Sequence, residues 1–285
     1  LQMNAQAAIS AMELYEAFGE TEYLSHGVSF ARILMACQAS AVDPSFSIPL
    51  RGYFYENETH ERIQTYYHRS YEHAPIKAFA MLYRLAPEHE DAARWKNSLE
   101  LYREYVALTS RTVPYGLLPN GIYELDNTDF STITHEGARA AGAPSLEEYN
   151  AQVRNGIRLN DRFYLRVFPV AYQFRGFHAT LMGRALAAME LARALNDREI
   201  KQVAVRQMEW ILGCNPFAVS SMYGEGHDYH PLYAPMSPQL VGAVPVGFET
   251  FENEDQPFYP MQNNAAYKEV WVHTTCRMMW LIAML

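Results

Sequence analysis

The chain has 285 residues, of which 49% are hydrophobic and 19% charged, so it can form a substantial core and is not disordered as a whole. Its 23 Lys and Arg stand against 32 Asp and Glu, a formal charge of −9. Without a basic cluster, nucleic acid is excluded as an expected partner, because neutralising phosphates needs grouped cations. The longest apolar stretch, residues 278–285, is far shorter than the roughly 20 residues that cross a bilayer, so no membrane span is expected.

Helical periodicity begins at the N-terminus and persists through the first third of the chain. Apolar residues at helical spacing predict one helix that ends at Gly19 and a second over about 21–39. A Pro- and aromatic-rich stretch, 43–58, is expected to be a long loop. Helix resumes over about 71–85. The next helix is expected to begin at Pro87, followed by acidic residues that complement the helix dipole.

The second half alternates long excursions with helices. Residues 112–162 lack sustained periodicity and contain several Gly, Pro and Asn, with one short helix expected over about 145–153. Residues 167–194 and 197–212 form a strongly predicted helix pair. A Gly- and Pro-rich excursion over 213–262 follows.

The last helix, about 264–285, is apolar nearly all round and is expected to be buried. Strand-like alternation is scarce apart from residues 240–246. Antiparallel helix pairs joined alternately by tight turns and long loops predict an all-α fold. We expect an (α/α) toroid of helical hairpins, possibly incomplete, as a single domain over 1–285 with a cleft formed by its long loops.

Three segments then resemble glycoside hydrolase family 9, the six-hairpin (α/α)6 cellulases and cellodextrinases. Residues 210–217 (WILGCNPF), followed by Ser220, Gly224 and Gly226, are similar to the family's LLGxNPxxxS…GxG segment. Residues 240–247 (LVGAVPVG) resemble its LVGALVGGP. Lys268-Glu269-Val270 heads an apolar helix, as the family's NEVAxDxNA does. The similar region covers about 168–285, so the chain looks like the C-terminal portion of a six-hairpin domain.

The resemblance implies an enzyme that hydrolyses glycosidic bonds of an oligo- or polysaccharide. It implies an inverting reaction, with Glu269 in the position of the general acid. Location outside the cytoplasm, periplasmic or secreted, is expected by the same analogy, although no signal peptide is visible in this chain. The alternative interpretation of Glu269 is a first-turn residue that complements a helix dipole.

Two departures from the family concern its active site. Residues 226–231 (GHDYHP) stand where the family has its His-His-Arg substrate loop, and the DAGD motif that carries its catalytic base does not occur. An inverting glycosidase needs two carboxyl groups about 6.5–9.5 Å apart. Weak candidates for the second, each also explicable as a turn residue, are Asp126, Asp129, Glu225, Asp228, Glu249 and Asp255.

Substrate contacts are expected from aromatic, His and Arg residues near the predicted loop end of the toroid. Aromatic rings can stack on sugars, and Arg can bind a hydroxyl or carboxylate in a bidentate manner. His178 is alternatively a satisfied core residue. Residues 68–75, which include Tyr71 and His73, are alternatively a helix start with Glu72 near the N-terminal dipole and Pro75 in the first turn. The candidates are Tyr71, His73, Arg175, His178, Tyr229, His230 and Trp271.

The sequence indicates no cofactor and no metal site. Cys37, Cys214 and Cys276 are widely spaced, and neither a zinc motif nor a phosphate-binding loop occurs. A carbohydrate is therefore the expected partner, and the oligomeric state stays open. Two alternatives to a hydrolase remain: a polysaccharide lyase acting on uronate-containing glycans, and a non-catalytic glycan-binding domain.

Overall fold

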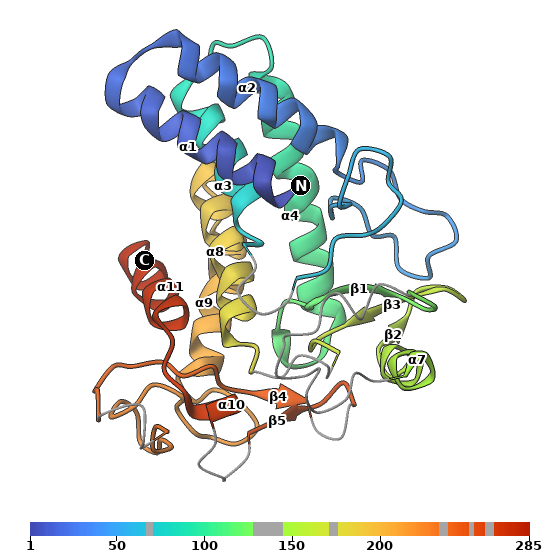
Figure 1. Ribbon diagram of the computed structural model, residues 1–285, viewed down its shortest axis with the longest axis vertical. Helices are drawn as coiled ribbons and strands as arrows, with labels where there is room; N and C mark the ends of the chain where they lie inside the picture. Colours follow the sequence, from blue (N-terminus) through green and yellow to red (C-terminus); the bar gives the residue numbers. More distant parts are fainter. Residues whose placement is uncertain (67–70, 128–144, 171–175, 234–238, 251–253, 260–264) are drawn as a thin grey trace.

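The computed structural model describes residues 1–66, 71–127, 145–170, 176–233, 239–250, 254–259 and 265–285. Its long helices form hairpins, and the connecting loops and short strands gather mainly at one end, the lower end in Figure 1. The first hairpin comprises α1 (Gln2–Phe18) and α2 (Thr21–Ala36). Gly19 closes it at φ 72°, a left-handed conformation that favours glycine, and its N–H donates to Tyr15 O at 2.8 Å.

The second hairpin comprises α3 (Ala74–Leu85) and α4 (Ala92–Thr112). The expectation that α4 begins at Pro87 was wrong, because the residues before Ala92 form turns instead. Asp91 ends that turn as a buried carboxylate, which accepts from Arg32 at 2.9 Å and from Arg94 at 2.8 Å. Asp91, the residue just before α4, thus connects α2 with α4 through its carboxylate and does not cap the backbone of α4 with its side chain.

The third hairpin comprises α8 (His178–Leu195) and α9 (Arg198–Ile211). The Asp197 carboxylate caps α9 by accepting from two backbone N–H groups of its first turn. α8 does not begin at residue 167 as expected. The N–H groups of Val167 and Phe168 donate to the Asp255 carboxylate, at 3.0 and 2.9 Å, and Pro169 has no N–H to donate.

Between the second and third hairpins the chain forms a small sheet that the sequence did not predict. Its antiparallel order is β1-β3-β2, from β1 (Gly121–Glu124), β2 (Ile157–Arg158) and β3 (Phe163–Arg166). The expected short helix is present as α7 (Leu146–Arg154), begun by a capping box of Ser145 and Glu148. A 3₁₀ turn over Pro114–Gly116, η1, leads from α4 towards this sheet.

The C-terminal segment is two helices rather than one. α10 (Ala265–Lys268) and α11 (Val272–Ala283) are separated where Val270 pairs with Pro245, and the alternating stretch 240–246 contributes this bridge rather than a strand. α11 is not buried all round either, since Val272 is 74% and Met279 63% exposed. A two-stranded sheet, β4 (Glu249–Thr250) with β5 (Pro257–Phe258), lies beside this segment.

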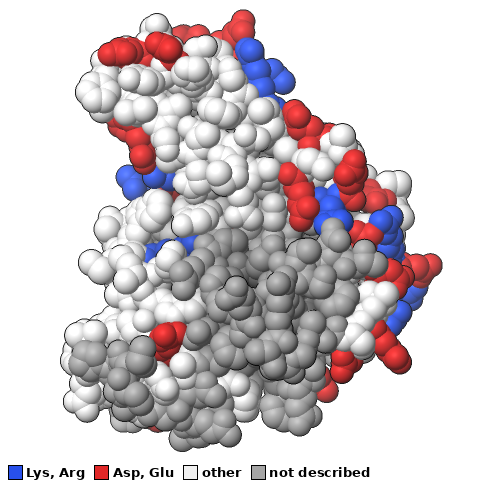
Figure 2. Space-filling view, viewed as in Figure 1, with Lys and Arg blue, Asp and Glu red and all other residues white. Residues whose placement is uncertain are grey.

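The main hydrophobic core is organised around α8, which packs against α3, α4, α9 and α11. In Figure 1, α8 and α11 both begin at the loop end, so residues at their first turns face the connecting segments. On the face shown in Figure 2, charged side chains gather along the top and the right-hand edge, and the side near α11 carries few. No helix in the described ranges is long and apolar enough to cross a membrane.

Candidate functional site

Glu269 lies at the loop end, in the break between α10 and α11 rather than on a helix. Its side chain is half-buried, and its carboxylate accepts a hydrogen bond from the indole N–H of Trp271 at 2.8 Å. The Trp271 ring is itself buried, so it holds the carboxylate from a fixed position. Glu269 therefore does not lie in the first turn of a helix, and the helix-dipole interpretation of this residue was wrong.

The backbone of Glu269 is held by the segment 244–248. Val246 donates its N–H to Glu269 O at 3.0 Å, and Gly247 donates to Tyr267 O at 2.7 Å. On its other side the same segment receives the N–H of His178, which donates to Val246 O at 3.1 Å. The segment 244–248 thus lies between the beginning of α8 and the break that carries Glu269.

His178 is fully buried at the first position of α8. One ring nitrogen, Nδ1, lies 3.1 Å from Pro245 O, and the other, Nε2, accepts from the Phe248 N–H at 3.3 Å. Burial lowers the pKa of His178 to about 3, so the ring is neutral. Both ring nitrogens are bonded to backbone, and the residue is inaccessible to solvent. The structure therefore places His178, a predicted sugar contact, in the protein interior beside the site.

Tyr71, His73 and Arg277 lie together where α3 and α11 meet. The Arg277 guanidinium lies 5.4 Å from the Tyr71 ring centroid and donates to Ala179 O at the start of α8. His73 is buried, and its ring stands edge-on to Tyr71 at 5.9 Å and to Trp280 at 5.2 Å. Burial, with Arg277 and Lys77 nearby, lowers the pKa of His73 to about 3. Tyr71 is 40% exposed and is the member of this group that can meet a ligand.

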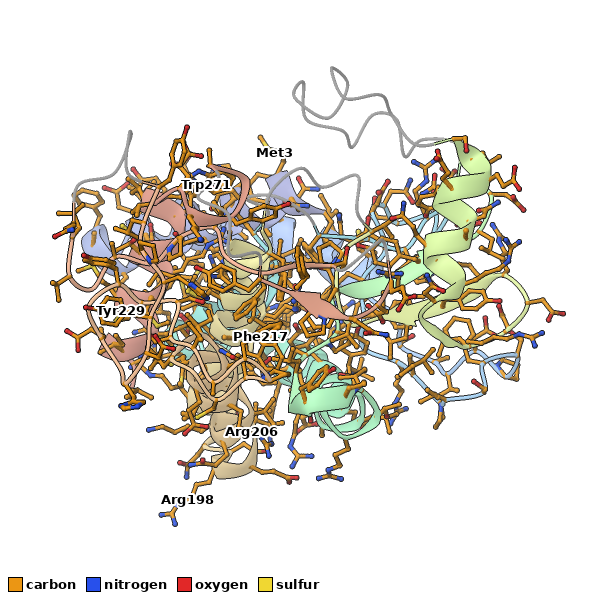
Figure 3. All side chains as sticks on the ribbon, turned by 90° about the horizontal axis from the view of Figure 1, so that it is seen from below. Met3, Arg198, Arg206, Phe217, Tyr229 and Trp271 are labelled. Carbon is orange, nitrogen blue, oxygen red and sulfur yellow. The ribbon has the colours of Figure 1, made fainter. Side chains whose placement is uncertain are left out.

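Tyr229 and His230 occupy the long connection between α9 and α10. Tyr229 is 40% exposed, and its ring stands edge-on to Tyr223 at 5.3 Å. His230 stands edge-on to Tyr259 at 4.6 Å. Burial and the nearby Lys268 cation lower the pKa of His230, whereas Asp228 raises it. Figure 3 views the molecule from the loop end and shows Trp271, Phe217 and Tyr229 among these segments.

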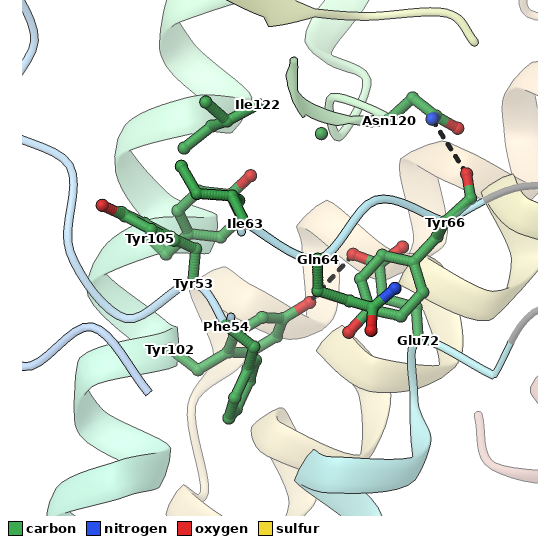
Figure 4. Close-up of a pocket in the computed structure, with 11 residues that line it drawn as sticks. Tyr53, Phe54, Ile63, Gln64, Tyr66, Glu72, Tyr102, Tyr105, Asn120 and Ile122 are labelled. Atoms are coloured by element: carbon green, nitrogen blue, oxygen red, sulfur yellow. Dashed lines mark hydrogen bonds between the residues drawn. The ribbon is translucent and has the colours of Figure 1, made fainter. Parts of the chain in front are cut away.

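A second carboxyl, Glu72, lies deeper, between α3, α4 and α8. It is 7% exposed, accepts from the Tyr102 hydroxyl at 3.5 Å and lies 3.8 Å from the Arg184 guanidinium. Arg184 also donates to Asn120 Oδ1 at 3.0 Å. Figure 4 shows Glu72, Tyr102, Asn120 and Tyr66 among the residues that line a small cavity of about 20 Å³, which has room for one water molecule.

The Glu72 group is polar and buried. Burial raises the pKa of Glu72 to about 8, against the opposing effects of Arg184, Tyr102 and Arg277. Burial also lowers the pKa of Arg184, although the nearby Glu72 raises it. Within the described part of the chain, Glu72 Oε2 and the Tyr66 hydroxyl have no hydrogen-bond partner. The carboxyl is therefore held in its protonated form around neutral pH.

The other expected carboxyls divide into turn residues, exposed residues and residues beyond the description. Asp126, in a turn after β1, accepts from the Asn150 side chain of α7 at 2.7 Å, and Asp255 holds the backbone before α8. Glu225 and Asp228 are exposed. Asp129, Arg175 and the side chain of Glu249 lie outside the described residues. No group of three or more metal-ligating side chains is found within the ranges described.

The sequence interpretation missed the buried cations Arg184 and Arg277. Both had a visible signal, since each is a single charge inside an otherwise apolar helical run, LMGRALAAM and TTCRMMWLI. Such residues are rarely buried without a partner. Glu72 had been interpreted as a dipole-complementing residue at a helix start. It lies before the first residue of α3 instead and points inward.

No protein-family model matches the chain, and no curated protein matches it significantly. Among solved structures, the cellulase Cel9M of C. cellulolyticum is similar over all of this chain and 50% of its own, with 14% identity and a TM-score of 0.52. The same cellulase in complex with cellobiose is similar over all of this chain and 51% of its own, with 14% identity and a TM-score of 0.53. The chain has the α/α toroid fold.

This similarity confirms the predicted helical-hairpin architecture and, at the level of the fold, the resemblance to glycoside hydrolase family 9. The chain spans about half the length of the cellulase structures that it matches. At 14% identity the likeness establishes how the chain folds. The chemistry of the site has to be argued from its own residues.

Proposed function

We propose that this protein is a glycoside hydrolase that cleaves an oligo- or polysaccharide by inversion, with Glu269 as the general acid. The observation that carries the proposal is the position of Glu269 in a cellulase-like fold: a half-buried carboxylate at the loop end, oriented by the buried indole of Trp271. By the same resemblance, we propose that the protein works outside the cytoplasm.

In this mechanism the Glu269 carboxyl protonates the glycosidic oxygen as the bond to the anomeric carbon breaks. A water molecule attacks that carbon from the opposite face, assisted by a second carboxylate. None of the described carboxyls is assigned as this base. The Asp126 carboxylate accepts a hydrogen bond from the Asn150 side chain, the Asp255 carboxylate holds the backbone before α8, and Glu72 is buried and protonated at neutral pH.

Exposed aromatic rings at the loop end supply surfaces for sugar rings. Tyr71 and Tyr229 are each 40% exposed, and Arg277 under the Tyr71 ring fixes its orientation. Stacking of apolar sugar faces on such rings supplies affinity without requiring a charged substrate. His230, half-buried beside Tyr259, is placed to contact a hydroxyl. We propose that these residues bind the glycan.

To test the proposal, the protein is incubated with cello-oligosaccharides, xylan and uronate-containing glycans. Turnover is measured from the reducing ends released. Proton NMR of the first product identifies inversion as the anomer opposite to that of the cleaved bond. Glu269→Gln is expected to lower kcat by about 10²- to 10⁴-fold, because the amide cannot donate the proton. Its affinity for the same glycan, measured by calorimetry, is expected to stay that of the unsubstituted protein.

Glu209→Gln is the matched control, since it makes the same substitution at an exposed site on α9 and is expected to leave turnover unchanged. Equal kcat for Glu269→Gln and the unsubstituted protein would remove Glu269 from the mechanism. Unsaturated products that absorb in the ultraviolet would indicate a lyase. Glycan binding without turnover by any variant would indicate a binding domain.

A further inference from the structure

His178 is the residue whose contacts connect the central helix to the candidate acid. From the first turn of α8, its ring contacts two backbone groups of the segment 244–248: the carbonyl oxygen of Pro245 and the N–H of Phe248. A single neutral tautomer satisfies both contacts: Nδ1–H donates to Pro245 O while Nε2 accepts from Phe248 N–H. The ring therefore fixes the segment at two points rather than one.

One glycine in the segment 244–248 and another just before α8 show how closely the segment packs against the beginning of the helix. Gly247 has φ 84°, and a β-carbon at that position would overlap the His178 ring. A β-carbon at Gly176, just before α8, would overlap the carbonyl oxygens of Val246 and Gly247. The backbone of the segment 244–248 is thus pressed against the beginning of α8, with no space for it to shift toward the helix.

The opposite side of the segment is bonded to the Glu269 region. The Val246 N–H reaches Glu269 O at 3.0 Å, and Val244 exchanges hydrogen bonds with Thr274 and Thr275 of α11, at 2.5 and 3.3 Å. A displacement of the segment would therefore displace Glu269 and the start of α11 together. The imidazole lies two hydrogen-bonded steps from the Glu269 backbone.

We propose that His178 is a positioning residue for Glu269, acting through the segment 244–248. The inference rests on the proposed function, in which Glu269 acts as the acid. It assigns to His178 a contact with backbone in place of the contact with substrate that the sequence suggested. Loss of the ring leaves substrate-binding residues such as Tyr229 in place but lets the carboxyl move out of line with the bond to be cleaved.

The experiment compares His178→Leu, which removes both ring contacts, with His178→Asn and His178→Gln. Asn can retain a donor near the Nδ1 position, and Gln an acceptor near the Nε2 position. We expect His178→Leu to lower kcat about 100-fold with KM unchanged, because misplacement by about 1 Å costs that much. The two amide variants are expected to recover part of the loss. The assay is run well below the unfolding temperature of every variant.

Leu186→Ala is the control for a merely structural effect. Leu186 is fully buried on the same helix, and its truncation is expected to destabilise by about 2–5 kcal/mol while leaving both His178 ring contacts in place. We expect its kcat per folded molecule to stay unchanged. A fall in kcat equal to that of His178→Leu would overturn the proposal, because general destabilisation would then explain both.

Hydrogen exchange supplies a readout that does not depend on turnover. The amides of Val246 and Gly247 are both bonded to the Glu269 region, so His178→Leu is expected to speed their exchange, and Leu186→Ala is not. Unchanged exchange and unchanged kcat in His178→Leu would overturn the positioning role. Absence of glycan turnover in the unsubstituted protein, with exchange accelerated as expected, would overturn the proposed function and leave the contact between His178 and the segment established.

Discussion

Glu72 lies between the helices and Glu269 lies at the loop end, and the surroundings of the two carboxyls differ in kind. Glu72 lies in a buried group with Tyr102, Asn120 and Arg184, and the residue is only 7% exposed. Glu269 lies in a loop between short helices, keeps part of its surface open and is oriented by one indole N–H. Burial has raised the pKa of Glu72 to about 8, so this carboxyl keeps its proton at neutral pH.

The difference separates a carboxyl that shapes the fold from one that can perform chemistry. A general acid needs a substrate oxygen within hydrogen-bond reach, and a cavity with room for only one water cannot admit a sugar. A perturbed pKa alone would have selected Glu72 as the functional group. The partial exposure of Glu269, which lets a substrate reach its carboxyl, favours Glu269 instead.

The largest expected effect is the dependence of the free energy of unfolding on pH, which we attribute to Glu72. Folded Glu72 keeps its proton up to about pH 8, whereas the unfolded carboxyl releases it near its ordinary value of 4.5. Ionisation therefore favours the unfolded state, and the free energy of unfolding falls as pH rises between these values, by up to about 1.4 kcal/mol per pH unit. Urea unfolding of Glu72→Gln is expected to lack this slope.

Glu209→Gln is the control, because it makes the same substitution at an exposed site on α9. Its profile is expected to follow that of the unsubstituted protein. Parallel profiles for Glu72→Gln and the unsubstituted protein would show that Glu72 is ionised in the fold, stabilised by Arg184. The contrast between the two carboxyls would then be lost.

An intermediate effect is expected at the indole that holds Glu269. Trp271→Phe keeps a ring in the same buried site but removes the N–H that donates to the carboxylate. A hydrogen bond contributes about 0.5–1.5 kcal/mol, and we expect kcat to fall by up to about tenfold as the carboxyl loses its orientation. Steady-state kinetics on the best glycan substrate measure this. A change confined to KM would mean that Trp271 binds sugar without orienting the acid.

The smallest effect is expected at an exposed carboxylate. Glu104 accepts two hydrogen bonds from Arg51, at 2.5 and 2.8 Å, with both side chains well exposed to solvent. Screening by water and salt limits such pairs to about 1 kcal/mol or less. Glu104→Gln is expected to change the free energy of unfolding within that limit at all pH values. A cost above 2 kcal/mol would show that the surface pairs matter as much as the buried Glu72 group.

Much of the helical framework was predictable from the spacing of apolar residues. Gly19 and the Asn196-Asp197 break were recognisable because left-handed and capping positions favour particular residue types. The beginning of α8 was not predictable. It depends on the Asp255 carboxylate, far away in the sequence, binding the backbone of Val167 and Phe168 in place of helical partners.

The candidate site was predictable in part, for the same reason. Lys268-Glu269-Val270 could be recognised from local residue order, and Trp271 is near enough in the sequence to be linked with Glu269. The break that places them depends on Val270 pairing with Pro245. Arg184 and Arg277 carried a signal as single charges in apolar helices, but the sequence does not say which residues they meet.

The sequence by itself determined the helical hairpins, the turns between them and the residue types available at the loop end, because periodicity and turn preferences are local properties. Tertiary structure decided which of two similar glutamates is closed off and which is open. It also decided that His178 faces backbone rather than a ligand. Burial and hydrogen bonding between distant segments depend on how the helices pack. Whether a charged side chain contacts water, a partner or neither is therefore set by the tertiary structure.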